Sequence, residues 1–482
     1  MTQEPNYFLI QYALAVGCII CLCIWLKLSF SPTEFPYAGN GRVPFLGVLE
    51  SIVKGKQLLR DVYETQLEDD QAYRLRGLFG DSIVLPPTML QWVISQPETS
   101  LSAKWAQLDA LNIPITFLRS EIGTDPLHEP VVRRDLTANL DRLEDVIWEE
   151  VGSSLELIWG KQRFWCEVNL DHTIRRIVGS SLCQQDDYIE NCIRYVTQVS
   201  TIGLLLGVFP YWLRQTVGVI ATIPIRTTYA ACSKYLVPHF LSTSSPERTP
   251  DLLSRRIMAL NFATIHTSTM TTCNLLLDIA SQPSTLSMLR EESQTSNARW
   301  NDSCTRARLN QMYNLDSALR ESLRLWGPVP KAMTRKVIHQ DGISLPTGQH
   351  LPQGVTVCVS GWGLHHDNAI YPRGYEFVHD RFKRTSQQVT LDGSQDKKTT
   401  PRKSLAAAET DESFATWGIG KHACPGRFFA VDLIKIIVSR ILLDYEIKIQ
   451  EKRPDNVWIE YNIIPPPNAM LRVRRRIGAP KN

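Results

Sequence analysis

The sequence predicts a mainly α-helical protein with a small β region, preceded by one N-terminal transmembrane helix. Residues 7–26 form an almost uninterrupted apolar segment. Further along, apolar residues recur with a helical period, as over residues 136–159 and 255–281. Short segments near residues 334–337 and 355–360 are typical of strands between Gly and Pro turns. Together these three patterns give the fold class.

The apolar segment is long enough to span a bilayer, because twenty residues rising ~1.5 Å each match a hydrocarbon core of ~30 Å. The alternative is a cleavable signal peptide, but no basic residue precedes the segment and no small-x-small site follows Leu26. Glu4 lies before the segment, and several basic residues follow it. These are Lys27, Arg42, Lys54 and Lys56. We therefore expect a membrane anchor over residues 1–27, with the rest of the chain in the cytosol.

After the anchor, prolines and glycines between positions 32 and 44 predict a stiff hinge, residues 28–49. No change in composition marks a second soluble domain, so residues 50–482 are taken as one domain. Within it, residues 385–412 are polar and indicate a surface loop.

Composition excludes some classes of function. Hydrophobic residues make up 43% and charged residues 21%, which is ordinary for a globular chain. A net charge of +3, with no basic run interleaved with aromatics, argues against nucleic acid as a partner. The eleven cysteines have no paired spacing, which indicates reduced thiols on the cytosolic side of a membrane.

The most informative segment is residues 417–430, WGIGKHACPGRFFA. Cys424 lies in a Gly-rich loop, and Pro425 is favoured at the first position of the helix that should follow. Backbone N–H groups and the macrodipole at that helix N-terminus would favour a thiolate. Gly418 and Gly420 allow the backbone to approach a flat partner. This pattern is typical of a cysteine that ligates haem iron, the alternative being a buried structural cysteine.

The segment resembles the haem-binding loop of the cytochrome P-450 family, F-x-x-G-x-x-x-C-x-G, with Trp417 where the family usually has Phe. An aromatic ring that can pack against the sulfur is kept. The resemblance implies the cytochrome P-450 fold and haem b with Cys424 as the axial thiolate. A Pro-rich hinge also follows the anchor in membrane-bound members of the family.

A second match is the charged pair Glu321 and Arg324, whose i, i+3 spacing places both on one helical face. Alone, such a pair is most often a solvated surface pair. The flanking LDSALR and LWGP resemble the family's ExxR helix and its exit. Downstream, HDRF at 379–382 looks like the family's PERF segment, which would supply Arg381 as a third member. The implied role of this cluster is structural, as a scaffold for the haem loop.

A third match is residues 262–269, FATIHTST, which resembles the family's oxygen-binding helix. The resemblance makes Thr267 the threonine that would hold dioxygen and deliver protons. His266 replaces the usual acid, and Thr264 replaces the usual glycine. Threonine within a helix commonly bonds back to the i−4 carbonyl. His266 is either a proton shuttle or a spectator bonded to a backbone carbonyl.

The resemblance also implies cations for the haem propionates, and His422, Arg335 and Arg133 occupy the matching positions. Glu129 stands one turn before Arg133, where the family has Trp, so a plain surface arginine is an equal alternative there. Lys421 and nearby basic residues would guide an acidic electron donor.

The implied function is a cytochrome P-450 monooxygenase, residues 50–482 being its catalytic domain, anchored in the endoplasmic reticulum membrane and facing the cytosol. It would use O2 and electrons from NADPH through a separate cytochrome P-450 reductase, with cytochrome b5 as a further donor, because the chain has no G-x-G-x-x-G nucleotide loop after a strand. The expected substrate is a lipophilic, terpenoid-type secondary metabolite, before polyketide or fatty-acid derivatives. Two alternatives remain at this point: a haem-thiolate isomerase or dehydratase, and a non-catalytic membrane haem protein.

Overall fold

The computed structural model describes residues 34–78, 80–125, 128–180, 185–240, 249–301, 303–383 and 406–477. The predicted anchor, 1–27, and residues 385–405 of the predicted surface loop lie outside these ranges. Among the described residues, no helix combines the length and the apolar character that crossing a membrane requires.

Helices make up most of the described chain. In order they are α2 (Pro44–Asp69), η1 (Pro87–Met89), α3 (Leu90–Ser95), α4 (Ala103–Ala110), α5 (Ile113–Thr116), α6 (Glu121–Thr124), α7 (His128–Pro130), η2 (Val131–Leu136), α8 (Leu140–Trp159), α9 (Leu170–Ser180), α10 (Asp186–Gly207), α11 (Tyr211–Ala221), α12 (Ile223–Leu236), η3 (Val237–Phe240), α13 (Pro250–Ala280), α14 (Pro283–Arg299), α15 (Arg306–Asn310), α16 (Tyr313–Trp326), α17 (Gly361–His366), η4 (Gly420–His422) and α19 (Arg427–Asp444).

The strands are short and, apart from Cys166–Asn169, come before α4 or after α16. They are β1 (Tyr73–Leu75), β2 (Ser82–Leu85), β3 (Leu101–Ser102), β4 (Cys166–Asn169), β5 (Lys331–Val337), β6 (Ile343–Ser344), β7 (His350–Leu351), β8 (Thr356–Ser360), β9 (Tyr445–Lys448), β10 (Val457–Ile459), β11 (Asn462–Ile464) and β12 (Met470–Arg475).

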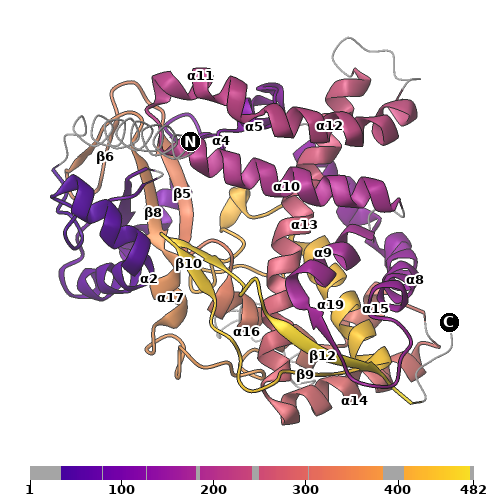
Figure 1. The fold of residues 1–482 in the computed structure, drawn as a ribbon. Coiled ribbons are helices and arrows are strands. Elements are labelled where there is room, and N and C mark those ends of the chain that lie inside the picture. Colours follow the sequence, from indigo (N-terminus) through magenta and orange to yellow (C-terminus); the bar gives the residue numbers. More distant parts are fainter. Residues whose placement is uncertain are drawn as a thin grey trace, which may run out of the picture.

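The long helix α13 runs through the middle of the molecule, with α10 crossing it and α9, α16 and α19 packed around it (Figure 1). Thr249 caps its N-terminus by accepting a hydrogen bond from the N–H of Leu252. Every residue from 268 to 280 is buried, so this half of α13 is the centre of the main hydrophobic core. The helix therefore fixes the position of the candidate residues that it carries.

A second core lies under a five-stranded sheet with strand order β1-β2-β8-β5-β3. β2 and β8 run parallel, and the other neighbouring strands are antiparallel. Figure 1 shows α2 beside this sheet, at the opposite side of the molecule from α8. The register of β5 against β8 shifts between Ala332 and Arg335. This irregularity lies directly downstream of α16.

The predicted helices and strands are present, but some boundaries differ. The expected helix 136–159 is split, because η2 ends at Leu136 and α8 begins at Leu140. Residues 44–49 of the predicted hinge form the first turns of α2, which begins at Pro44. A proline is tolerated at the first helical position because no acceptor is needed for its missing N–H. The Pro- and Gly-rich composition therefore continues into the start of a helix.

Candidate active site

The segment from Trp417 to Cys424 forms a tight loop directly before α19. The N–H of Cys424 donates to the carbonyl oxygen of Trp417 at 2.7 Å. Gly418 and Gly420 have φ of +72° and +71°, the left-handed conformation that side chains disfavour. Both glycines are therefore needed for the turn that brings Cys424 back beside Trp417.

The Cys424 thiol is largely buried at the N-terminus of α19, which begins at Arg427 rather than at Pro425. Burial raises the pKa of the thiol, although the N–H groups of Gly426 and Arg427 and the guanidinium of Arg427 oppose that rise. The helix N-terminus alone thus does not favour the thiolate as the sequence predicts, because the desolvation cost is larger. A thiolate here needs a further positive charge, such as a metal ion.

The aromatic ring at the start of the loop belongs to Trp417, which packs against the main core. Its indole Nε1–H donates to the carbonyl oxygen of Ala407 at 2.8 Å. The indole N–H is therefore bonded to backbone, and the Trp side chain anchors the loop to residues just before it.

The three predicted members of the charge cluster meet around one carboxylate. Glu321 of α16 is completely buried and accepts from Arg324 Nε and Nη2, both at 2.8 Å. Arg381 Nε lies 3.0 Å from both carboxylate oxygens, and the N–H of Val378 donates at 3.1 Å. Arg324 Nη1 also donates to the carbonyl of Gly374 at 2.7 Å. The cluster thus ties α16 to the loop of residues 374–381.

Thr267 is exposed, and so is Ala263 one turn earlier on the same face of α13. We call this the open face of the helix. Its hydroxyl donates to the carbonyl of Ala263 at 2.6 Å, the i−4 bond that helical threonines commonly make. The hydroxyl oxygen keeps its lone pairs, so it can still accept a hydrogen bond from the open side.

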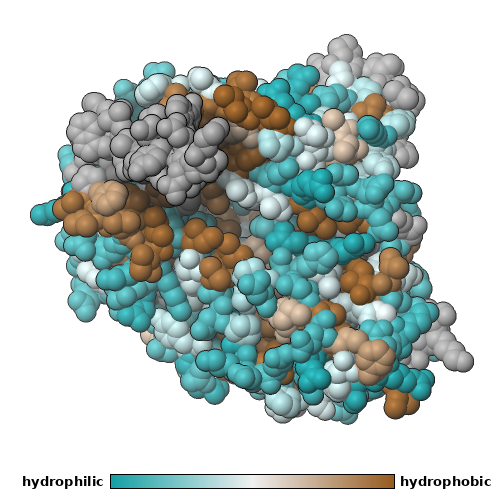
Figure 2. Space-filling view, in the orientation of Figure 1, coloured by the Kyte–Doolittle hydropathy of each residue, from teal (hydrophilic) through white to brown (hydrophobic). Residues whose placement is uncertain are grey.

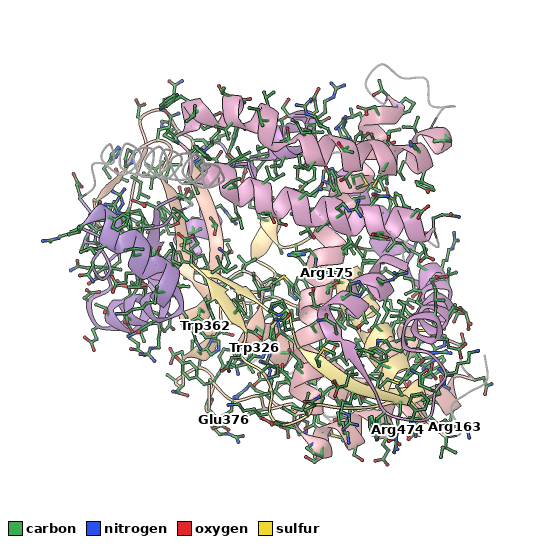
Figure 3. The ribbon with its side chains drawn as sticks, in the orientation of Figure 1. Arg163, Arg175, Trp326, Trp362, Glu376 and Arg474 are labelled. Carbon is green, nitrogen blue, oxygen red and sulfur yellow. The ribbon has the colours of Figure 1, made fainter. Side chains whose placement is uncertain are left out.

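His266 points instead toward α9, where Arg175 lies beside α13 (Figure 3). Arg175 Nη1 lies 3.2 Å from His266 Nδ1, and Arg175 Nε donates to Asp171 at 2.9 Å. Burial, with the nearby Arg175, lowers the pKa of His266 to about 4. Because a guanidinium can only donate, Nδ1 accepts and the neutral ring carries its proton on Nε2. A chain Asp171–Arg175–His266 therefore fixes the tautomer.

The three predicted propionate partners have different surroundings. Arg335 is 6% exposed and pairs with no carboxylate among the described residues; its Nη1 donates to the carbonyl of Thr334 at 2.9 Å. Arg133, on η2, pairs with Glu129 at 2.9 Å, and its Nη1 donates to the carbonyl of Lys421 at 3.2 Å. Arg133 thus contacts the thiol loop, although it is partly exposed.

His422 has a partner that sequence reasoning missed. Its Nε2 lies 3.1 Å from Glu98 Oε2. Glu98 also accepts from the Ser102 hydroxyl and from the N–H groups of Ala103 and Lys104 at the start of α4. These bonds outweigh burial and lower the pKa of Glu98. The one sequence signal for Glu98 is the preference of acidic residues for helix N-termini. That preference does not predict that Glu98 would pair with His422.

Contacts join these groups in one region, because Glu98 contacts His422 and accepts from Ser102, which lies opposite Lys336, the neighbour of Arg335. Burial lowers the pKa of His422, Glu98 raises it, and the charge of Arg335 lowers it further. Arg133 in turn lowers the pKa of the Cys424 thiol. A buried guanidinium without a carboxylate and a thiol flanked by N–H groups are the donor set that a haem with its propionates would use. The residues present therefore fit this cofactor.

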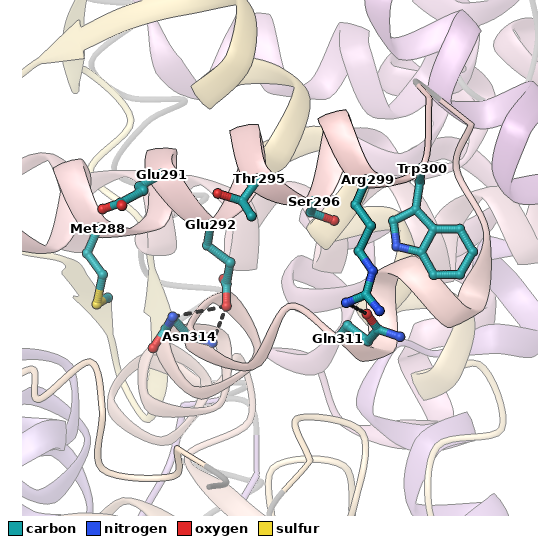
Figure 4. A pocket seen from close by; sticks show the side chains of 9 residues that line it. All are labelled: Met288, Glu291, Glu292, Thr295, Ser296, Arg299, Trp300, Gln311 and Asn314. Atoms are coloured by element: carbon teal, nitrogen blue, oxygen red, sulfur yellow. Dashed lines mark hydrogen bonds between the residues drawn. The ribbon is translucent and has the colours of Figure 1, made fainter. Parts of the chain in front are cut away.

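A cavity of about 300 Å³ lies elsewhere, between α14 and the start of α16 (Figure 4). Glu292 lines it and accepts from the N–H groups of Asn314 and Leu315 at 2.8 and 2.9 Å. These bonds cap the N-terminus of α16. Glu292 thus supports the helix that carries Glu321.

Comparison with known proteins agrees with this geometry. The family profile described as Cytochrome P450 matches residues 237–473. Cytochrome P450 monooxygenase astC of Aspergillus terreus is 28% identical, over 96% of this chain and 95% of the relative. Cytochrome P450 monooxygenase lnaC of Aspergillus flavus is 27% identical, over 96% and 97%.

A third relative is cytochrome P450 monooxygenase 110 of Postia placenta, which is 30% identical over 96% of this chain and 97% of its own length. Similarity of this extent covers the thiol loop, the Glu321 cluster and α13 together. The chain therefore belongs to the cytochrome P450 family and is a haem-dependent monooxygenase.

Proposed function

We propose that this chain binds haem b through the thiolate of Cys424 and oxidises a lipophilic, terpenoid-type secondary metabolite. The observation that carries the haem site is the Trp417–Cys424 loop, in which two left-handed glycines turn the chain so that a buried thiol lies at the start of α19. When bound, a haem with an axial thiolate supplies reductive activation of dioxygen. The side chains around it then have separate tasks.

Arg335 would bind a propionate, because a buried guanidinium that has no carboxylate partner among the described residues needs an anion. His422 and Arg133 complete the propionate site, with Glu98 and Glu129 as their partners within the protein. The scaffold is formed by Glu321, Arg324 and Arg381, which join α16 to residues 374–381. The carboxylate of Glu321 at the centre of this cluster is completely buried.

The Thr267 hydroxyl holds a proton on Oγ1, which it donates to the carbonyl of Ala263, and its oxygen can accept a hydrogen bond from the open face of α13. To donate toward that face, the hydroxyl must leave the carbonyl of Ala263. His266 is neutral and carries its proton on Nε2, so it can act as a hydrogen-bond donor at that atom. We assign proton delivery to Thr267. His266, whose tautomer is fixed by its contact with Arg175, has a supporting role.

The test of the haem site is the reduced, carbon-monoxide difference spectrum of wild type, Cys424→Ala and Cys166→Ala. Cys166 is the matched control, a partly buried free cysteine on β4. A red-shifted Soret band in wild type and Cys166→Ala, absent from Cys424→Ala, is the expected result. A band of the histidine-ligated type in wild type, or an unchanged band in Cys424→Ala, would reject Cys424 as the ligand. Circular dichroism of Cys424→Ala separates loss of ligation from loss of fold.

We further propose that the protein is held at the endoplasmic reticulum membrane, with the catalytic domain in the cytosol. The apolar segment 7–26 supports this, and so do exposed hydrophobic side chains on two elements of the same face (Figure 2). Around α2 they are Val43, which directly precedes the helix, and Phe45, Leu46, Leu49 and Val53 on it; on α11 they are Tyr211, Trp212, Val219 and Ile220. Large exposed apolar patches of this kind suit a membrane interface.

Deletion of residues 1–27 tests the anchor and the patch separately. The truncated protein should move partly from the membrane fraction into the supernatant while keeping its haem spectrum. Adding Trp212→Glu, a 70% exposed position on α11, should release the remainder. A truncated protein that stays fully in the membrane fraction would reject the anchor as the main attachment. A double variant that behaves like the truncation alone would reject the α11 patch.

The electron donor is proposed to be NADPH–cytochrome P-450 reductase, with cytochrome b5 as a further donor, and the substrate a terpenoid. The anchor supports entry of a lipophilic compound from the bilayer, and the FATIHTST and GKHACPGRFFA segments resemble terpenoid oxidases. The test is a panel of terpenoids, polyketides and fatty acids, measured by Soret shifts and then by turnover. Product that requires both O2 and NADPH is expected with a terpenoid. Turnover of polyketides or fatty acids alone would reject the terpenoid class, and product formed without O2 would identify an isomerase.

A further inference from the structure

Strand β5 contains a bulge directly downstream of α16. Ala332 lies opposite Val359 of β8, and Arg335 lies opposite Val357. Two residues of β5, Met333 and Thr334, therefore oppose a single residue of β8. An extra residue on one strand of an antiparallel pair defines a β-bulge and is able to re-aim the side chains that follow it.

The bulge decides which face of the sheet receives Arg335. Residues opposite each other in an antiparallel pair point to the same face, and Val357 and Val359, two positions apart, share a face. Ala332 and Arg335 therefore share that face, although residues three apart in a regular strand point to opposite faces. In a regular strand Thr334 would oppose Val357, and Arg335 would lie on the other side.

The bulge is built from a strained residue. Met333 has φ of +54°, a left-handed conformation that is uncommon for a residue other than Gly, Asn or Asp. Its side chain is 5% exposed and belongs to the core under the sheet. Strain of this kind persists only where the surrounding packing holds it, and it concentrates at functional sites.

The bulge also orients the guanidinium directly. Arg335 Nη1 donates to the carbonyl of Thr334, a bulge residue, at 2.9 Å. Thr334 Oγ1 in turn donates to the carbonyl of Lys331 at 2.9 Å, which braces the bulge from the preceding turn of chain. Lys336, the next residue, lies opposite Ser102 of β3, and Ser102 donates to Glu98, the partner of His422, so this part of β5 lies near the thiol loop.

We propose that the Met333–Thr334 bulge is a positioning device that aims the Arg335 guanidinium at a propionate of the haem. The inference rests on the proposed haem site and deepens it. Without the bulge, Arg335 would point to the opposite face of the sheet, and the thiol loop would lose its one buried cation that has no carboxylate partner among the described residues. Met333 and Thr334 act through Arg335 and bind nothing themselves.

The test is a double-mutant cycle of Met333→Val and Arg335→Gln. A β-branched residue resists the left-handed conformation, so Met333→Val disfavours the bulge. Three quantities are measured on the full chain: the rate of haem loss to excess apomyoglobin, the reduction potential, and the urea midpoint of the haem-free protein. Met333→Val is expected to speed haem loss several-fold in wild type and to have little effect in the Arg335→Gln background. The reduction potential should show the same non-additivity.

Met333→Gly is the matched variant, because glycine adopts a positive φ freely although it leaves a cavity in the core. It should lower the urea midpoint at least as much as Met333→Val, yet lose haem several-fold more slowly than that variant. If Met333→Val gives no folded protein, Thr334→Val takes its place, since it removes the bond to Lys331.

The outcomes separate the inference from the function on which it rests. Equal acceleration of haem loss in both backgrounds, or haem loss that simply follows the urea midpoint, would overturn the positioning role. Haem loss at the wild-type rate in Arg335→Gln, with a normal carbon-monoxide band, would also overturn it while the haem site stands. Absence of that band from wild type would instead reject the proposed haem site.

Discussion

Replacement of Glu321 by Gln tests the buried charge cluster most directly. The substitution keeps the shape of the side chain but removes the negative charge between Arg324 and Arg381. The three side chains are 0%, 0% and 12% exposed, so water cannot replace the lost carboxylate. The new amide NH2 would also face guanidinium donors, which have no acceptor to offer it.

The magnitude follows from what the carboxylate holds. Glu321 accepts two bonds from Arg324, one from the Nε–H of Arg381 that both carboxylate oxygens share, and one from the N–H of Val378. Breaking a buried ion pair by removing one partner costs about 3–5 kcal/mol, because the remaining charges stay buried and uncompensated. We expect a loss of about 4 kcal/mol in the free energy of unfolding, a large part of the stability of a typical native protein.

The assay is urea unfolding, followed by far-UV circular dichroism, with Glu376→Gln as control. Glu376 lies at the surface nearby (Figure 3) and pairs with Arg373 at 3.5 Å, both side chains being more than 60% exposed. Such an exposed pair contributes about 0–1 kcal/mol. If Glu321→Gln destabilised the protein no more than Glu376→Gln, the structural role of the cluster would be refuted.

Three other predictions concern acid–base balance, proton delivery and electron transfer. Burial raises the pKa of Glu144 from 4.5 to about 8, so the folded state binds a proton that the unfolded state has released, and stability falls as pH rises through that window. Between about pH 6 and about pH 8, the wild type should lose about 2 kcal/mol more of its free energy of unfolding than Glu144→Gln, as measured by urea midpoints. Parallel pH profiles of stability for the two proteins would contradict this. Thr267→Ala should lower product about tenfold or more while NADPH consumption continues and hydrogen peroxide appears, whereas Thr271→Ala, one turn away with the same i−4 bond, should stay coupled. Lys421→Glu should raise the reductase concentration needed for half-maximal reduction about five-fold at low salt, an effect absent from Lys54→Glu and lost at high salt; equal effects would exclude steering at the thiol loop.

Features set by short-range chemistry could be predicted from the sequence. The i, i+3 spacing of Glu321 and Arg324 requires only a helix to bring them together, and both lie on α16. The need for glycine at positions 418 and 420 follows from the turn itself. Boundaries were less predictable, as at Pro44, because proline is compatible both with a hinge and with a helix start.

The surroundings of the candidate residues could not be predicted in this way. The partner of His266 is Arg175, 91 positions earlier on another helix, and together with burial it makes the ring neutral rather than a charged shuttle. Glu98 meets His422 through a contact across more than 300 positions. A local sequence pattern cannot predict such pairs, because the chain between the two partners can have any length and composition.

The sequence by itself predicted which residues would carry the chemistry: a cysteine in a Gly-rich loop, a threonine in a long helix, and an ExxR pair, each recognisable within one or two helical turns. Tertiary structure decided their protonation and their direction. Desolvation raises the pKa of Cys424 and lowers that of His266, and the bulge at Met333 turns Arg335 to the face where it can act. Burial and strand register depend on which distant segments pack together, so these properties exist only once the chain has folded.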